Sequence, residues 1–162
     1  MTSAPLSDER AAQRLDEMLR AWAEQWRASG LVADVDHREQ SDARGHVHWL
    51  VRLRGEEKDV ITIWLTLRQR TVYVETEVMP APNEQREALY KYLLVKNATL
   101  RQLHLAIGPE EGIYLVTNIP VGELTFERLD EVIGATVHYV DEIYPTAMAL
   151  GLVSLYRRRL SR

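Results

Sequence analysis

Histidine residues are the first candidates for chemistry in this chain. His46 and His48 are two positions apart, so on an extended strand they share one face, and His37 on a neighbouring strand could supply a third ligand. Zinc requires three or four ligands that converge on one point, and spacing fixes no carboxylate beside this pair. We therefore interpret these histidines as surface residues of a polar strand face, and we expect no metal and no cofactor.

Glu75 and Glu77 are the candidates for acid–base chemistry, because they share a strand face. Positions two apart lie about 6.6–6.8 Å from each other, and an open sheet face rarely excludes water. Pairing with Arg52, or solvation, explains both carboxylates better. No serine lies in a nucleophile-elbow pattern, and the segment Gly108–Gly112 is explained as a hairpin turn. We therefore expect a protein that is not an enzyme.

The composition limits the class of protein. The chain has 162 residues, a net charge of −4 and no cysteine, which fits a single domain over residues 1–162 without disulfides. The acidic balance, without a long block of one sign, argues against a nucleic-acid partner. No apolar run approaches the ~20 residues of a membrane span, and the start lacks a signal-peptide pattern. These features predict a cytoplasmic protein with no membrane partner.

Apolar residues at spacings of three and four predict three helices. The first covers about residues 8–28, the second about residues 83–96, and the third should end or kink at Pro145. A basic tail follows from about residue 152, and we expect it to be solvated and frayed. The predicted N-caps are Ser7, Asn83 and Thr125.

Strict alternation predicts an antiparallel meander over residues 46–79, after a weaker strand over 32–39 and a polar loop over 40–45. Turns at Gln69–Arg70 and near Glu57 gather the aliphatic side chains on one face, and a one-residue slip would scatter them. The predicted opposite pairs are Leu67–Val72, Leu65–Val74, Ile63–Thr76 and Ile61–Val78, then Leu53–Ile61, Val51–Ile63 and Trp49–Leu65.

A second hairpin follows the second helix. It places Ile113 opposite Ile107 and Leu115 opposite Leu105. The order of elements is helix, three or four strands, helix, two strands, helix. An antiparallel sheet with helices packed on it is an α+β fold.

Several short motifs accompany this order of elements. They are Leu93-Leu94-Val95-Lys96-Asn97-Ala98, Ile113-Tyr114-Leu115, Leu124-Thr125 and Asp141-Glu142-Ile143-Tyr144. Over about residues 45–151 the chain resembles the YbjN-like family, whose proteins look similar to type III secretion chaperones. The resemblance implies a small α+β sandwich, frequent homodimers and no known chemistry, and some members are linked to regulation of signalling or stress.

One face of the meander, opposite to the aliphatic one, is the candidate for binding another polypeptide. The predicted register places Leu50 near Trp64, Trp64 opposite Glu75, and Tyr73 diagonal to Trp64, with Arg52 in the neighbouring row. An apolar, aromatic centre with a charged rim is typical of interfaces. The alternatives are that a terminal helix covers this face or that the aromatics are ordinary cross-strand pairs.

The second helix is the candidate for a dimer interface, because it is apolar around much of its circumference. Tyr90 and Leu94 face outward if Leu89 and Leu93 face the sheet, and a twofold contact could bury them. The alternative is a monomer in which the first or third helix covers Tyr90 and Leu94. We expect a noncatalytic, chaperone-like or regulatory protein-binding homodimer. The alternative function is a small-ligand or metal-binding protein, or an enzyme, with a pocket between sheet and helices.

Overall fold

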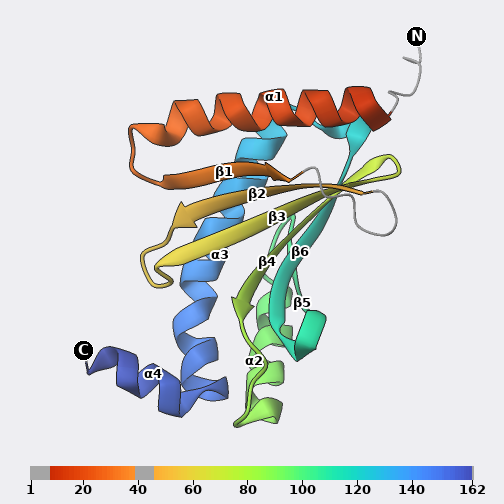
Figure 1. The fold of residues 1–162 in the computed structure, drawn as a ribbon. Helices are drawn as coiled ribbons and strands as arrows, with labels where there is room; N and C mark the ends of the chain where they lie inside the picture. The colour runs from red at the N-terminus through yellow and green to blue at the C-terminus, as the bar shows by residue number, and fades with distance from the viewer. Residues whose placement is uncertain (1–7, 39–45, 162) are drawn as a thin grey trace.

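The protein, seen here as a computed structural model, is described over residues 8–38 and 46–161. It is an α+β fold built on one six-stranded antiparallel sheet with the strand order β1-β2-β3-β4-β6-β5 (Figure 1). The main elements are α1 (Asp8–Arg27), β1 (Val32–Arg38), β2 (Val47–Arg54), β3 (Val60–Arg68), β4 (Thr71–Met79), α2 (Arg86–Asn97), β5 (His104–Ile107), β6 (Ile113–Pro120), α3 (Phe126–Gly151) and α4 (Val153–Leu160). The predicted order, with three or four strands before the second helix, is confirmed up to α3: the structure has four such strands, and α4 follows as an element that was not predicted.

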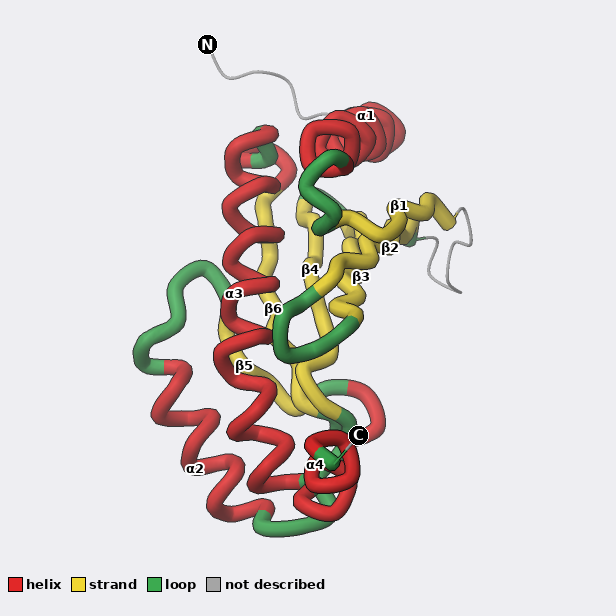
Figure 2. The backbone as a smooth tube through the Cα atoms, turned by 90° about the vertical axis from the view of Figure 1, so that its left-hand side faces the viewer, coloured by secondary structure: helices red, strands yellow, loops and turns green. Residues whose placement is uncertain are grey.

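The larger helices gather on one side of the sheet. Helix α3 packs on β3 and β4, α1 packs on β1 and on α3, and α2 packs against α3 and β5. Figure 1 shows α3 running behind the strands, and Figure 2 shows α3 and α2 together on one side of the sheet. We call the surface of the sheet under α3 the inner face and the opposite surface the outer face.

The register of the meander is the one that the aliphatic pattern predicts. Val51 lies opposite Ile63 and Leu65 lies opposite Val74. The second hairpin also has the predicted partners, with Leu105 opposite Leu115 and Ile107 opposite Ile113. The aliphatic side chains that β2, β3 and β4 turn toward the helices form the fully buried centre of the core. They include Val51, Leu53, Ile61, Ile63, Leu65, Val72, Val74 and Val78.

Two tryptophans of α1, Trp22 (buried) and Trp26 (partly buried), link α1 to α3. The indole N–H groups of Trp22 and Trp26 both donate to Oδ1 of Asp130, at 2.8 and 2.9 Å. The indole of Trp49 donates to Asp16 at 3.2 Å, so the sheet is also linked to α1. Because a buried indole N–H needs an acceptor, these carboxylates let large aromatic rings fill the space between α1 and the sheet.

The predicted helix starts are right in one case and wrong in another. Thr125 caps α3, since its hydroxyl accepts a hydrogen bond from the Arg128 N–H. Asn83 does not cap α2, which begins at Arg86 after Gln85 in a left-handed conformation. The backbone N–H of Asn83 instead donates to Gly151 at the end of α3, and this contact keeps Asn83 outside the helix. The predicted cap Ser7 and the loop over 40–45 lie outside the described residues.

Pro145 does not end the third helix. Helix α3 continues to Gly151, because Tyr144, Ala147 and Met148 on both sides of the proline are buried against the core. The predicted frayed tail is also wrong, since it forms α4. Arg159 fastens α4 by donating to the Tyr144 hydroxyl, the Glu57 carbonyl and the Asp59 carboxylate, at 2.7 to 2.9 Å.

A carboxylate of α3 holds the turn between β2 and β3. Asp141 accepts hydrogen bonds from the backbone N–H groups of Glu56, Glu57 and Lys58, at 2.9 to 3.2 Å. A side chain at Gly55 has no room, because its Cβ would lie 2.3 Å from the Lys58 carbonyl. The turn is therefore fixed by a residue far away in the sequence.

Replacing Asp141 tests this contact. We expect Asp141→Asn to lower the free energy of unfolding by about 1–2 kcal/mol, because a charged acceptor shared by three donors is lost. The matched control is Glu142→Gln on the next position of α3, whose carboxylate is exposed and pairs with Lys96; we expect less than about 1 kcal/mol. Urea unfolding measures both, and equal midpoints for the two variants would contradict the role of Asp141.

Candidate partner-binding face of the sheet

The outer face is assembled by the strand register. Across the sheet, Leu50 lies opposite Trp64, Trp64 opposite Glu75, and Glu75 opposite Val116. Because directly paired residues in an antiparallel sheet project to the same side, these residues form one row. The neighbouring rows of the outer face contain Thr66, Tyr73 and Asn118 on one side, and Arg52, Thr62, Glu77 and Tyr114 on the other.

The helices of the described part of the chain leave this face open. Helices α1 and α3 pack on the inner face, and α2 packs beyond it on α3 and β5. In Figure 1 the strands β2, β3 and β4 lie in front of α3, with no helix in front of them. The alternative that a terminal helix covers the aromatic face is therefore not what the described residues show.

Most of the predicted partner-binding residues lie together on this face and are partly exposed. Trp64, Tyr73, Arg52 and Glu75 keep part of their surface in contact with solvent. Leu50 differs, because it is only 2% exposed and so offers no surface to a partner. Alternation assigned Leu50 to the correct face, but neighbouring side chains bury it there.

The charged groups of this face are paired differently from the prediction. Arg52 donates to Asp34 at 3.0 Å, and the Arg68 guanidinium lies 4.1 Å from the centre of the Tyr73 ring. Arg52 therefore does not neutralise Glu75 or Glu77. Within the described part of the chain, neither of these two glutamates forms an ion pair with a basic side chain, and the contact from the Tyr114 hydroxyl to Glu77 is long, at 3.4 Å.

Glu75 is the electrostatically perturbed residue of the outer face. Partial burial raises its pKa, while the charge of Arg68, a hydrogen bond with Tyr73 and the charge of His48 act in the opposite direction. Desolvation penalises the ionised form of a carboxyl group. Because the pKa of Glu75 is raised and the carboxylate has no ion pair among the described residues, its neighbours do not fully offset the cost of burying the ionised form.

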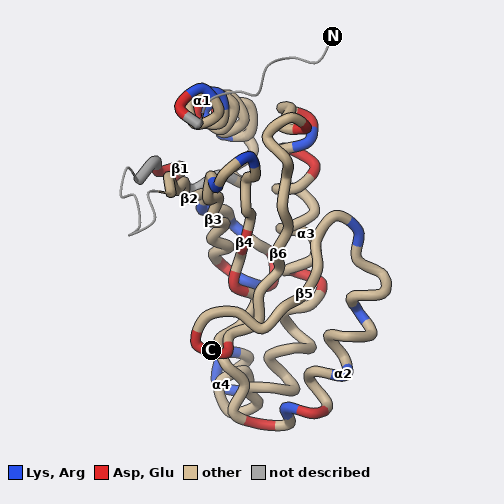
Figure 3. Tube along the Cα trace, turned by 90° about the vertical axis from the view of Figure 1, so that its right-hand side faces the viewer, with Lys and Arg blue, Asp and Glu red and all other residues tan. Residues whose placement is uncertain are grey.

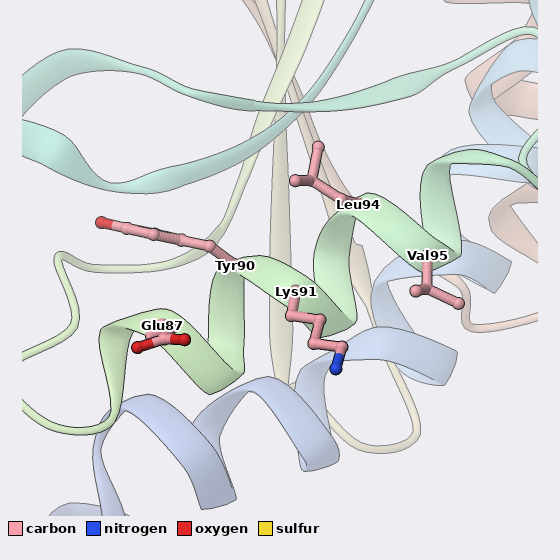
Figure 4. A pocket seen from close by; sticks show the side chains of 5 residues that line it. All are labelled: Glu87, Tyr90, Lys91, Leu94 and Val95. Carbon is pink, nitrogen blue, oxygen red and sulfur yellow. The ribbon is translucent and has the colours of Figure 1, made fainter.

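Helix α2 carries a second exposed apolar surface, the α2 strip. Leu89 and Leu93 face the core, whereas Leu94 and Val95 are 70% and 64% exposed. A shallow hollow of about 730 Å³ lies along this side and is lined by Glu87, Tyr90, Lys91, Leu94 and Val95. Tyr90 and Leu94 project to the same side of the helix (Figure 4), and charges of both signs lie along α2 (Figure 3).

The α2 strip contains both residues predicted for a dimer interface, Tyr90 and Leu94. The prediction missed Val95, Glu87 and Lys91, which belong to the same strip. Their spacing of three and four along the helix is the signal that could have identified them.

The edge of the sheet beside α2 is closed by a side chain. Asn97, the last residue of α2, accepts from the Leu105 N–H at 2.6 Å and donates to the Leu105 carbonyl at 3.1 Å. Its amide therefore occupies the backbone groups that an added strand would use, which discourages pairing at β5. Binding by the outer face or the α2 strip is favoured over strand addition at Leu105.

His37 and His48, which were weighed as metal ligands and interpreted as surface residues, fall in different rows of the strand register. The register places His48 opposite Thr66, with Nδ1 2.9 Å from the threonine hydroxyl, and places His37 opposite Trp49. Within the residues described, no group of three or more His, Asp or Glu side chains is arranged to hold a metal ion.

No helix in the described ranges is both long enough and apolar enough to span a membrane.

Comparison with known proteins identifies the family to which this chain belongs. The family model YbjN, described as "Putative bacterial sensory transduction regulator", matches residues 15–148. The chain therefore belongs to the YbjN family, which confirms the resemblance seen in the sequence.

Several mycobacterial proteins are similar to this chain in sequence. The uncharacterized proteins Mb0497 of Mycobacterium bovis and Rv0487 of Mycobacterium tuberculosis are each 32% identical to this chain over 117 residues, which is 70% of this chain. The aligned region spans 64% of the length of those relatives. The uncharacterized protein ML2442 of Mycobacterium leprae is 26% identical over 156 residues, covering 90% of this chain and 85% of ML2442.

A solved structure shares the fold. A chain of the ExsC–ExsE complex matches 88% of this chain and 97% of its own length, with a TM-score of 0.56 and 16% sequence identity. At this identity the match concerns the fold alone, and it confirms the predicted α+β architecture.

Replacing Glu75 tests its electrostatic state. We expect Glu75→Gln to raise the free energy of unfolding at neutral pH by less than about 1 kcal/mol, because solvent screens a half-exposed carboxylate. Because the pKa of Glu75 is raised in the folded protein, the wild type loses stability as the pH rises through that pKa. At low pH, where Glu75 is protonated, the wild type and Glu75→Gln should have similar free energies of unfolding. Urea unfolding between pH 4 and 8 measures this. A gain of the same size in exposed Glu24→Gln, or a loss in Glu75→Gln, would contradict it.

Proposed function

We propose that this protein is a noncatalytic, chaperone-like protein-binding domain that holds another polypeptide on the outer face. The observation that carries the proposal is the open, partly aromatic sheet surface around Trp64 and Tyr73, on which no described helix packs. Aromatic side chains with a charged rim provide most of the affinity in many interfaces. The structure with the shared fold is itself a complex of ExsC with ExsE, which supports a role in binding proteins. We place this role in the cytoplasm.

We further propose that the protein acts as a homodimer through the α2 strip. In an antiparallel pair of α2 helices whose contact is centred midway between Tyr90 and Leu94, Tyr90 of one copy lies against Leu94 of the other, and the reverse contact is made at the same time. Such a surface is complementary to itself, as a twofold interface requires. It would bury Leu94, one of the most exposed large apolar side chains of the described chain. The dimer leaves the outer face free for its partner.

The dimer is tested by Leu94→Asp. We expect the wild type to be dimeric at micromolar concentration and the variant to dissociate at least about tenfold more readily, because a charge replaces a buried contact. The matched control is Leu155→Asp on α4, which changes another exposed leucine and should leave the dimer intact. Sedimentation equilibrium measures all three proteins. A wild type that is monomeric at all concentrations would contradict the dimer.

The partner-binding face is tested by Trp64→Ala. We expect the variant to recover much less partner from an extract of its own cells than the wild type does. Its loss of stability should stay well below the ~3–5 kcal/mol of a fully buried tryptophan, because Trp64 is partly exposed. Affinity capture with mass spectrometry, and urea unfolding, measure the two effects. If Trp64→Ala unfolds the protein, Trp64 belongs to the core and the binding face lies elsewhere.

A further inference from the structure

We propose that the outer face recognises an extended polypeptide segment that presents Lys or Arg side chains to Glu75 and Glu77, with apolar residues on either side of them. The inference rests on the proposed function and specifies the chemistry of its partner.

The surroundings of Glu75 suit a cationic side chain. In the strand register Glu75 lies between Trp64 on β3 and Val116 on β6, and Tyr73 lies two residues before it on the same strand face. A carboxylate beside aromatic rings offers a cation both a charge-assisted hydrogen bond and the negative faces of the rings. The apolar parts of Trp64 and Val116 would contact the stem of a Lys or Arg side chain.

The basic residues closest to this row already have other partners. Arg52 binds Asp34, and Arg68 lies over the ring of Tyr73. Lys58 donates its Nζ protons to the backbone carbonyls of Glu77 and Val78. Across the residues that the structure covers, Glu75 and Glu77 are thus left without an ion-pair partner. The charges of Arg68 and His48 favour the ionised form of Glu75, but burial outweighs them and raises its pKa. A half-buried carboxylate without an ion pair carries a desolvation cost, and a cation supplied by a partner would offset it.

The spacing of the two carboxylates indicates the conformation of the partner. Glu75 and Glu77 are alternate residues of β4, so their positions lie about 6.6–6.8 Å apart. Alternate residues of an extended segment have the same spacing. A segment lying along β4, within about 30° of its direction as in packed sheets, would therefore align two basic side chains with the two glutamates. An apolar side chain before them would meet Tyr73, and one after them would lie just past Tyr114, which is opposite Glu77.

The affinity for a basic segment should decrease as the pH is lowered. A bound cation favours the ionised form of Glu75, whose pKa is raised in the free protein, so affinity should fall as pH falls through that pKa. The other titratable or charged groups that face Glu75 are Arg68, Tyr73, His48 and Glu77, with Tyr114 beside Glu77 and His104 opposite Val116. Loss of this pH dependence in Glu75→Gln would identify Glu75 as its source.

The experiment uses three fluorescein-labelled peptides and the full chain. In the first peptide, the positions that face the sheet are Val, Lys, Lys and Val, and Thr occupies the alternate positions. The second peptide has Gln in place of both Lys residues, and the third has Glu in place of both. Fluorescence anisotropy gives the affinities. We expect the Lys peptide to bind at least about tenfold more tightly than the Gln peptide, and the Glu peptide most weakly. Glu75→Gln should remove most of this preference, and exposed Glu24→Gln should leave it unchanged.

Three outcomes would overturn the inference. Equal binding of all three peptides, lost in Trp64→Ala, would mean an apolar face without charge selection, and the proposed function would stand without this partner chemistry. No binding of any peptide to the wild type would mean that the face does not take such a segment. A change in oligomeric state in Glu75→Gln, measured by sedimentation, would mean that a second copy of the chain occupies the face.

Discussion

The pairing register of β2, β3 and β4 is the constraint on which the rest of this structure depends. It places the aliphatic side chain of every second residue under α1 and α3, with Ile63 and Leu65 fully buried. The side chains between them must then project from the opposite surface. Because strands have a period of two, a shift by one residue would exchange the two faces and expose the core. The open aromatic surface is therefore a direct consequence of how the core is made.

Helix α3 converts this two-faced sheet into a rigid support. Its Asp130 receives the indole N–H groups of Trp22 and Trp26 from α1, and its Asp141 holds the turn between β2 and β3. Tyr144, further along the same helix, accepts a hydrogen bond from Arg159 of α4. All of these contacts lie on the helical side or at the end of the sheet. None of them involves the outer face or the α2 strip.

Local patterns predicted the elements that depend on local physics. Alternation and turn residues gave the register of both hairpins, and Thr125 was recognised as a cap because capping needs only a few neighbouring residues. The family motifs pointed to the same fold. What could not be predicted depends on distant contacts: Asn83 is held by Gly151, Pro145 stays within α3 because its neighbours are buried, and the basic tail is ordered by Arg159.

For the candidate site as well, local patterns predicted some features and distant contacts determined the others. The sequence correctly placed Trp64, Tyr73 and Glu75 on one face, since alternation determines faces. It could not show that Leu50 is buried there or that Arg52 pairs with Asp34, because both depend on the strand next to β2 and on side-chain packing. Glu75 was considered first as an acid–base residue. The structure presents it as a half-buried carboxylate without an ion pair in the described chain, which suits recognition of a charge.

The central claim is that one face of the sheet is buried under helices and the other is open. Hydroxyl-radical footprinting of the wild-type protein, with the oxidised residues identified by mass spectrometry, tests it most directly. The account predicts rapid oxidation of Trp64 and Tyr73, and strong protection of Trp49 and Trp22. Protection of Trp64 equal to that of Trp49 in the isolated protein would contradict it.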